Sequence, residues 1–181
     1  EIMPSLVGSE MCIRDRYMQL YNFNRQECVN YALKWAKGRN PKYYDFENLG
    51  GDCTNFASQS VYAGCGVMNV NYPLGWYYYN SFNRSPSWTS VEYFYNFLFR
   101  NEKSIGPVGK LTNLNELELG DLVQVKINGI YTHTLVITKI ENRNSAFDYF
   151  VCAHTYDALN RRLSTYNLKD ARFIKILGFY K

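Results

Sequence analysis

The chain has 181 residues, of which 46% are hydrophobic, which is enough for one domain with a substantial core. Its 20 basic and 16 acidic residues give a formal net charge of +4, and the basic residues are scattered, which argues against a nucleic-acid-binding stripe. No run of about 18 apolar residues is present, so no transmembrane segment is predicted.

The first residues are unlike the rest of the chain. Glu10–Arg16 reads EMCIRDR, and residues 1–16 resemble a translated sequencing adapter. We therefore interpret residues 1–16 as a non-native leader and residues 17–181 as a single domain. The natural N-terminus, and with it any export signal, is then not visible.

A first helix is predicted from Asn24, in NRQECVNYALKWAKGRNP. Asn24 and Glu27 have the spacing of a capping box, and small or apolar residues recur at helical intervals. Gly38 and Pro41 are expected to end the helix.

A second short helix is predicted in GGDCTNFASQSVYAGCG. Asp52 is a good N-cap residue, and Gly64 or Gly66 is a suitable terminator. Cys53 is then expected in the first turn of this helix.

The segment 67–87 is rich in Tyr, Asn, Gly and Pro and is predicted to be an ordered surface loop. Its aromatic side chains would either line a binding groove or pack the loop onto the core; they are Trp76, Tyr77, Tyr78 and Tyr79, with Trp88 just beyond. A third helix is predicted to start at Thr89, which forms a second capping box with Glu92.

Strand patterns follow a link that contains Gly and Pro. The candidate strands are LELGDLVQVKI, YTHTLVITKI, FDYFVCAHT and ARFIKILGFY, with a turn at ENRNSA between the second and the third. Because the helices come first and an antiparallel sheet second, the predicted fold class is α+β.

The cysteines do not form a metal-binding pattern. Without Cys12 in the leader, four remain, and none has CxxC spacing. A zinc site from Cys53, Cys65, His133 and His154 can be drawn, but it lacks the close ligand pairs of structural zinc sites. We predict no metal and no cofactor, and we interpret the cysteines other than Cys53 as small buried hydrophobic residues.

Cys53 is the candidate nucleophile. A helix N-terminus favours a thiolate and can bind a developing oxyanion, although the neighbouring Asp52 opposes thiolate formation. The chain has two histidines, His133 and His154, one on each side of the ENRNSA turn. If they pair directly across the hairpin, His154 can orient His133 as the base for Cys53.

Several motifs together resemble one family. GGDCTNFASQ, GWYYY, SPSWTSVEYFYNFL, LGDLVQV, YTHTLVIT and AHTYDALNRRLSTYN occur in the expected order. Over about Tyr21–Tyr180 the chain resembles the bacterial putative amidase domain, a branch of the papain-like cysteine hydrolases related to the NlpC/P60 and CHAP families.

The resemblance implies a papain-like α+β fold and amide hydrolysis through a thioester. Cys53 matches the family's nucleophile and His133 its base. The third residue is His154, with Asp157 as a competitor. Tyr43 or Tyr44 is a candidate side chain for the oxyanion site.

The resemblance also implies a substrate and a location. We expect a peptidoglycan peptide as substrate, and a secreted or cell-wall-associated bacterial protein. Two alternatives remain open: a non-catalytic wall-binding module of the same fold, and an acyl-transfer enzyme that uses the same residues.

Overall fold

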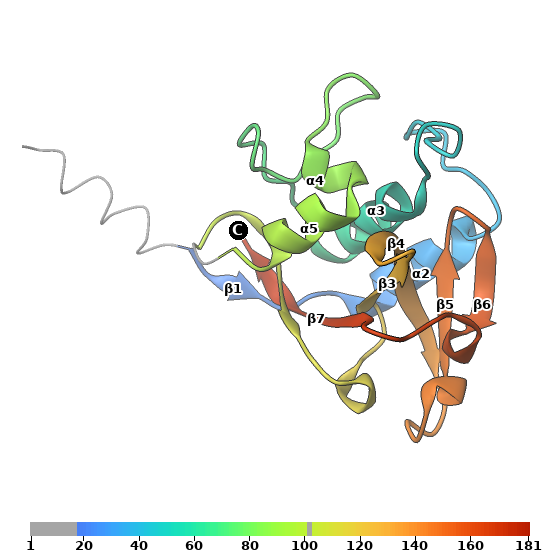
Figure 1. The fold of residues 1–181 in the computed structure, drawn as a ribbon. Helices are drawn as coiled ribbons and strands as arrows, with labels where there is room; N and C mark the ends of the chain where they lie inside the picture. The colour runs from blue at the N-terminus through green and yellow to red at the C-terminus, as the bar shows by residue number, and fades with distance from the viewer. Residues whose placement is uncertain (1–17, 101–102) are drawn as a thin grey trace, which may run out of the picture.

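A computed structural model describes residues 18–100 and 103–181, so the predicted leader at 1–16 lies outside the described residues. Helices α3, α4 and α5 gather on one side of a twisted sheet (Figure 1). Within the described ranges, no helix combines the length and the apolar character needed to cross a membrane.

Helices α2 (Arg25–Trp35) and α3 (Cys53–Cys65) form where the sequence predicts them. The Asn24 side chain accepts a hydrogen bond from the Glu27 amide at 3.1 Å, which confirms the first cap. Gly66 ends α3 with a φ of 67°, a left-handed conformation that glycine adopts at little cost. Cys53 is therefore the first residue of α3, as expected.

The third helix differs from its prediction. The chain forms a short helix α4 (Pro86–Thr89) and then α5 (Val91–Leu98), whose N-cap is Ser90. Pro86 starts a separate turn, which the Ser90 amide closes by donating to the Pro86 carbonyl at 2.9 Å. Thr89 is therefore used in α4, and the predicted capping box from Thr89 to Glu92 is wrong.

The described strands form one antiparallel sheet, which confirms the α+β class. The strands are β1 (Leu20–Tyr21), β2 (Gly106–Leu111), β3 (Leu122–Ile127), β4 (Ile130–Ile140), β5 (Tyr149–Ala153), β6 (Ala158–Arg162) and β7 (Arg172–Tyr180). Their order is β1-β7-β3-β4-β5-β6, with β2 also paired to β7. The sequence predicted β3, β4, β5 and β7; it missed the other three, including β2 in the Gly/Pro link.

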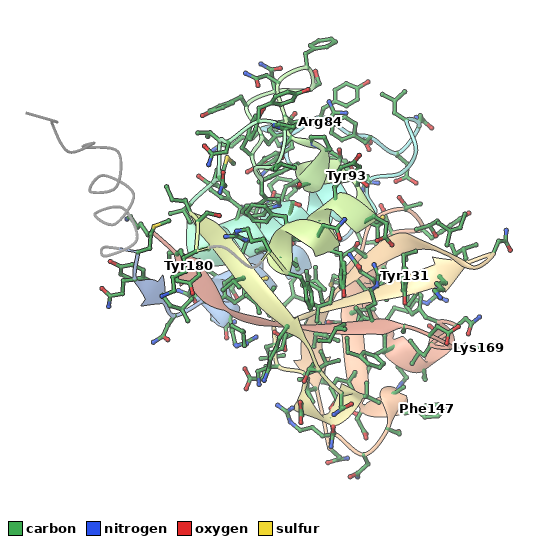
Figure 2. All side chains as sticks on the ribbon, turned by 60° about the vertical axis from the view of Figure 1, so that its left-hand side comes forward. Arg84, Tyr93, Tyr131, Phe147, Lys169 and Tyr180 are labelled. Carbon is green, nitrogen blue, oxygen red and sulfur yellow. The ribbon has the colours of Figure 1, made fainter. Side chains whose placement is uncertain are left out.

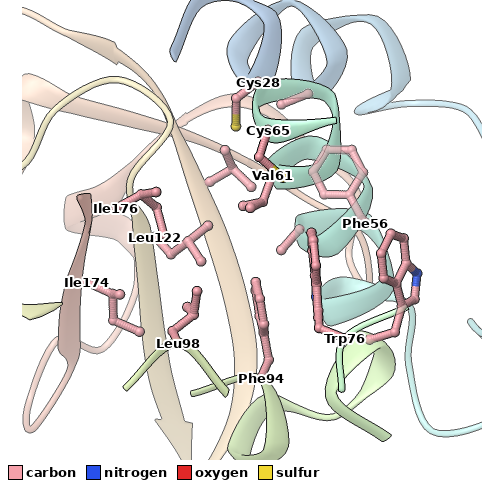
Figure 3. Close-up of a cluster of buried hydrophobic side chains, with 14 of the residues drawn as sticks. Cys28, Phe56, Val61, Cys65, Trp76, Phe94, Leu98, Leu122, Ile174 and Ile176 are labelled. Carbon is pink, nitrogen blue, oxygen red and sulfur yellow. The ribbon is translucent and has the colours of Figure 1, made fainter. Parts of the chain in front are cut away.

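Each face of the sheet carries its own hydrophobic core. The helices cover one face, and Figure 3 shows Phe56, Val61 and Trp76 on the helix side of this core, with Leu122, Ile174 and Ile176 on the sheet side. The core on the opposite face contains Val125, Leu135, Ile137, Val151 and Leu163. Since side chains alternate between faces along a strand, the register of β4 and β5 decides which core each histidine meets.

The aromatic loop packs mainly onto the helix-side core and rises above the helices around Arg84 (Figure 2). Trp76 and Trp88 are fully buried, and their indole N–H groups donate to Ser58 Oγ at 3.0 Å and Asn55 Oδ1 at 2.9 Å. Tyr77 and Tyr78 are also buried, whereas Tyr79 is 61% exposed. Packing is therefore the observed role of these rings, with Tyr79 the exception.

Candidate active site

Cys53 lies against the backbone of β4. Its Sγ is 3.5 Å from the Thr132 carbonyl oxygen, to which the thiol donates. On the far side of His133, the Thr134 hydroxyl is hydrogen-bonded to the Thr54 hydroxyl at 3.1 Å. The first turn of α3 thus contacts Thr132 and Thr134, the residues on either side of His133. Cys53 is buried there, with only 5% of its surface exposed.

The thiol is protonated in this environment. Burial raises the pKa of Cys53, and the Asp52 carboxylate adds to that rise. Hydrogen bonds from the Thr134 amide and the Thr54 side chain lower the pKa of Cys53 but do not outweigh burial. At neutral pH Cys53 is therefore a thiol and not a thiolate.

His133 lies on the sheet face opposite to the helices. It pairs with Val125 of β3, and its ring centroid is 6.1 Å from that of Tyr166. Burial lowers the pKa of His133 to about 4, and the positive charge of Arg161 contributes, so the imidazole is neutral at pH 7. Within the described residues, no hydrogen bond joins the ring to the Cys53 thiol.

The two histidines do not meet. The predicted direct pairing of His133 with His154 is wrong, because Val136 pairs with Cys152 and this register brings His154 level with Thr134. The register shifts between Ile137 and Lys139, which leaves Thr138 unpaired as a bulge. A shift of one residue moves a side chain to the other face, so His154 faces the helices and does not orient His133 in this structure.

His154 instead joins the start of α3 to the end of α2. Its Nδ1 is 2.5 Å from Asp52 Oδ2, and its Nε2 is 2.8 Å from the Trp35 carbonyl oxygen. The ring stacks on Phe56 with centroids 4.1 Å apart. Only 1% of the His154 side chain is exposed, so the ring is buried at this position.

Asp52 occupies the predicted N-cap position but does not cap the helix. Its side chain makes no hydrogen bond to the amides of the first turn. Oδ1 accepts from the Phe46 amide at 3.0 Å and from Asn55 Nδ2 at 2.8 Å, while Oδ2 faces His154. The carboxylate is therefore turned away from the amides that an aspartate N-cap normally binds.

Asp157, the competing third residue, belongs to a charge cluster centred on Arg39. Both carboxylate oxygens of Asp157 accept from the Arg39 guanidinium at 3.0 Å. Arg39 also lies 3.3 Å from Asp45, 3.3 Å from Glu47 and 3.8 Å from Asp52. Arg39 was not selected from the sequence, and no local pattern marks a contact between residues 118 positions apart.

The other cysteines lie away from the Cys53 thiol, and Tyr44 contacts the start of α3 through its backbone carbonyl. Cys65 is at the other end of α3, and the described residues contain no cluster of three metal-ligating side chains. Cys28, Cys65 and Cys152 are buried, as predicted for packing residues. Tyr44 lies beside the start of α3, where its carbonyl accepts from Asn55 Nδ2 at 3.0 Å.

Comparison with known proteins identifies a relative and a family. The chain is 29% identical over 152 residues to the uncharacterized protein YhbB of Bacillus subtilis (strain 168). The match covers 82% of this chain and 46% of that protein, so the chain spans about half the length of this relative. No solved structure matches the chain. The family model described as "Putative amidase domain" matches residues 22–177, and the chain belongs to this family.

Proposed function

We propose that this domain is a cysteine-dependent amide hydrolase with Cys53 as its nucleophile. The observation that carries the proposal is the position of the thiol, at the first residue of α3 and against the neighbours of His133 on β4. Membership of an amidase family supports amide hydrolysis as the reaction.

The proposed reaction has two steps. Cys53 Sγ attacks the amide carbonyl carbon and its proton passes to His133, which returns it to the leaving amine as the C–N bond breaks. Water then attacks the thioester, again with His133 as base, and releases the acid and the free thiol. Since the resting groups are a thiol and a neutral imidazole, His133 acts as a general base and not as half of a preformed ion pair.

Proton transfer requires the His133 side chain to cross from the sheet face beside Tyr166 to the helix face, which takes a change in the backbone of β4 and not a ring rotation alone. Pairing with β5 does not restrain this stretch of β4, because β5 pairs with β4 only from Val136 onwards. Thr132 and Thr134 therefore lie on a stretch of β4 that β5 does not cover. The Cys53 thiol occupies this stretch, at the Thr132 carbonyl.

The oxyanion would be stabilised by the start of α3. The first amides of a helix carry no intrahelical acceptor and bear partial positive charge. The Cys53 amide is the first of them, and Asp52 leaves these amides free of a carboxylate cap. Preorganised amides of this kind lower the energy of a tetrahedral intermediate.

We further propose a cell-wall peptide as substrate, a secreted or wall-associated location and a papain-like relationship for the fold. A cysteine that opens a helix packed on an antiparallel sheet supports the relationship. The substrate and the location rest on the motif resemblance to NlpC/P60 and CHAP hydrolases.

Purified peptidoglycan tests the activity. Wild type, Cys53→Ala and the control Cys65→Ala are incubated with it, and released fragments are identified by mass. We expect fragments from wild type and Cys65→Ala and none from Cys53→Ala. Equal release by Cys53→Ala would refute the nucleophile. Sedimentation of all three with the wall, without any release, would favour the binding module.

A second arm of the experiment includes a free amine such as glycinamide. Hydrolysis leaves a new carboxyl group on the fragment, whereas acyl transfer adds the mass of the amine. Products that carry the amine in preference to water would favour the acyl-transfer alternative.

A further inference from the structure

A buried carboxylate directly before the candidate nucleophile is unfavourable for the proposed chemistry. Asp52 is 1% exposed and is the N-cap residue of α3. Its charge raises the pKa of the Cys53 thiol, and a carboxylate on the first-turn amides would compete with the oxyanion for them. The fold therefore has to hold Asp52 away from these amides and balance its charge.

His154 meets both requirements. Asp52 Oδ2 and the Trp35 carbonyl oxygen are the partners of the two ring nitrogens, at 2.5 Å and 2.8 Å. An ionised carboxylate and a carbonyl only accept, so an imidazolium that donates from both nitrogens satisfies both. Its positive charge then lies against Asp52, and Arg39 places a second cation 3.8 Å from the same oxygen.

The residues that directly follow β5 also hold the backbone of Asp52. The Asp52 amide donates to Thr155 Oγ1 at 2.8 Å, and the Thr155 amide donates to Glu47 Oε2 at 3.2 Å. A Cβ on Gly51 would lie 3.0 Å from Thr155 Oγ1, so a larger residue would crowd this contact. His154 and Thr155 thus fix the side chain and the peptide of the residue before Cys53.

We propose that His154 is a positioning residue for the thiol hydrolase, acting through Asp52 and not through His133. It holds the Asp52 carboxylate away from the start of α3 and cancels its charge there. This inference rests on the proposed function, but its main consequence, the reactivity of the Cys53 thiol, can be measured without a substrate.

Three variants separate charge from hydrogen bonding. His154→Gln removes the positive charge that lies against the buried Asp52 carboxylate and leaves only Arg39, 3.8 Å away, as a cation near it. Asp52→Asn removes the negative charge and keeps an oxygen for the Phe46 amide and Asn55. Asp52→Asn/His154→Gln replaces the charged pair with two neutral amides that can still bond to each other.

The readout is the alkylation rate of Cys53 with iodoacetamide at pH 7.5, followed by mass spectrometry; kcat and KM on peptidoglycan are measured in parallel. We expect His154→Gln to slow alkylation about tenfold, as for a thiol pKa raised by one unit. The double variant should return to within about threefold of wild type, and Asp52→Asn alone should not be slower than wild type. His154→Gln should lose activity through a lower kcat, and the double variant should regain kcat.

A matched control removes a buried charge elsewhere. Asp121 is buried in an ion pair with Arg25 at 2.7 Å, so Asp121→Asn lowers stability without touching α3. It should leave the alkylation rate of Cys53 unchanged. A change as large as that in His154→Gln would mean that the effect is general destabilisation, and would overturn the proposal.

Three other outcomes separate a failure of the proposed role of His154 from a failure of the proposed substrate. If the double variant is as slow as His154→Gln, His154 does not act by balancing Asp52, and the proposal is wrong. If wild type releases nothing from peptidoglycan but alkylation follows the expected order, the positioning role stands and the proposed substrate fails. Unchanged alkylation in all three variants rejects the positioning role whether or not wild type is active.

Discussion

Acidification should destabilise the fold through His133. Burial, with a contribution from Arg161, lowers the pKa of His133 from its ordinary value of 6.5 to about 4. Between these values the unfolded chain binds more protons than the folded chain, so stability is fully present above about pH 6.5 and is lost as the pH falls. The difference in the pKa of His133 between the unfolded and the folded chain corresponds to about 3 kcal/mol in the free energy of unfolding. About 2 kcal/mol of this stability is lost between pH 7.5 and pH 5.

Urea unfolding of wild type and His133→Gln, followed by tryptophan fluorescence at pH 7.5, 6.5, 5.5 and 5.0, measures this loss. Wild type should lose about 2 kcal/mol more than the variant across the series. Burial raises the pKa of Asp45, but the hydrogen bond from the Glu47 amide and the charge of Arg39 together lower it below its usual value. The hydrogen bond from Lys175 lowers the pKa of Glu118, so both carboxyl groups titrate below this range.

Equal losses in the two proteins would refute the neutral, buried state of His133. A gain in stability on acidification that wild type shows and His133→Gln does not would refute it more directly. It would mean that an imidazolium is stabilised in the fold, as expected if the ring paired with a Cys53 thiolate.

Two further predictions concern the frame around the site, both measured by chemical unfolding. Gly64→Ala should cost about 3 kcal/mol, because its Cβ would lie 2.3 Å from Phe23 Cε2, whereas Gly66→Ala has no atom within 4 Å and should cost about 1 kcal/mol for its φ of 67°. Equal costs would contradict this reasoning. Arg25→Met leaves the buried Asp121 carboxylate without its cation and should cost about 3–5 kcal/mol. A cost below about 1 kcal/mol would mean that the amides of Glu118 and Ile176 are enough to stabilise the carboxylate.

Local signals in the sequence were sufficient for the main helices and strands. Asn24 caps α2 and Gly66 ends α3, because capping and left-handed termination depend on a few neighbouring residues. The β-branched content of β3 and β4 identified both strands for the same reason. Local competition explains the error at Thr89, since Pro86 starts an earlier turn that includes it.

The candidate site was predictable in its residue types but not in its contacts. A cysteine at a helix start, a histidine on β4 and a histidine directly after β5 were all identified from local patterns. One bulged residue, Thr138, then moved His154 to the other face of the sheet relative to His133. A bulge depends on how two strands pack, and no motif around Thr138 marks it.

By itself, the sequence determined that Cys53 opens α3 and that Asp52 precedes it at the cap position. Only the tertiary structure decided what Asp52 does there, because its partner His154 is 102 residues away and reaches it through the pairing of β4 with β5. The sign and position of a buried charge depend on such distant partners, since burial makes an unpaired carboxylate costly. The sequence therefore specified the position of Cys53 at the start of α3, and the fold specified the charge beside it.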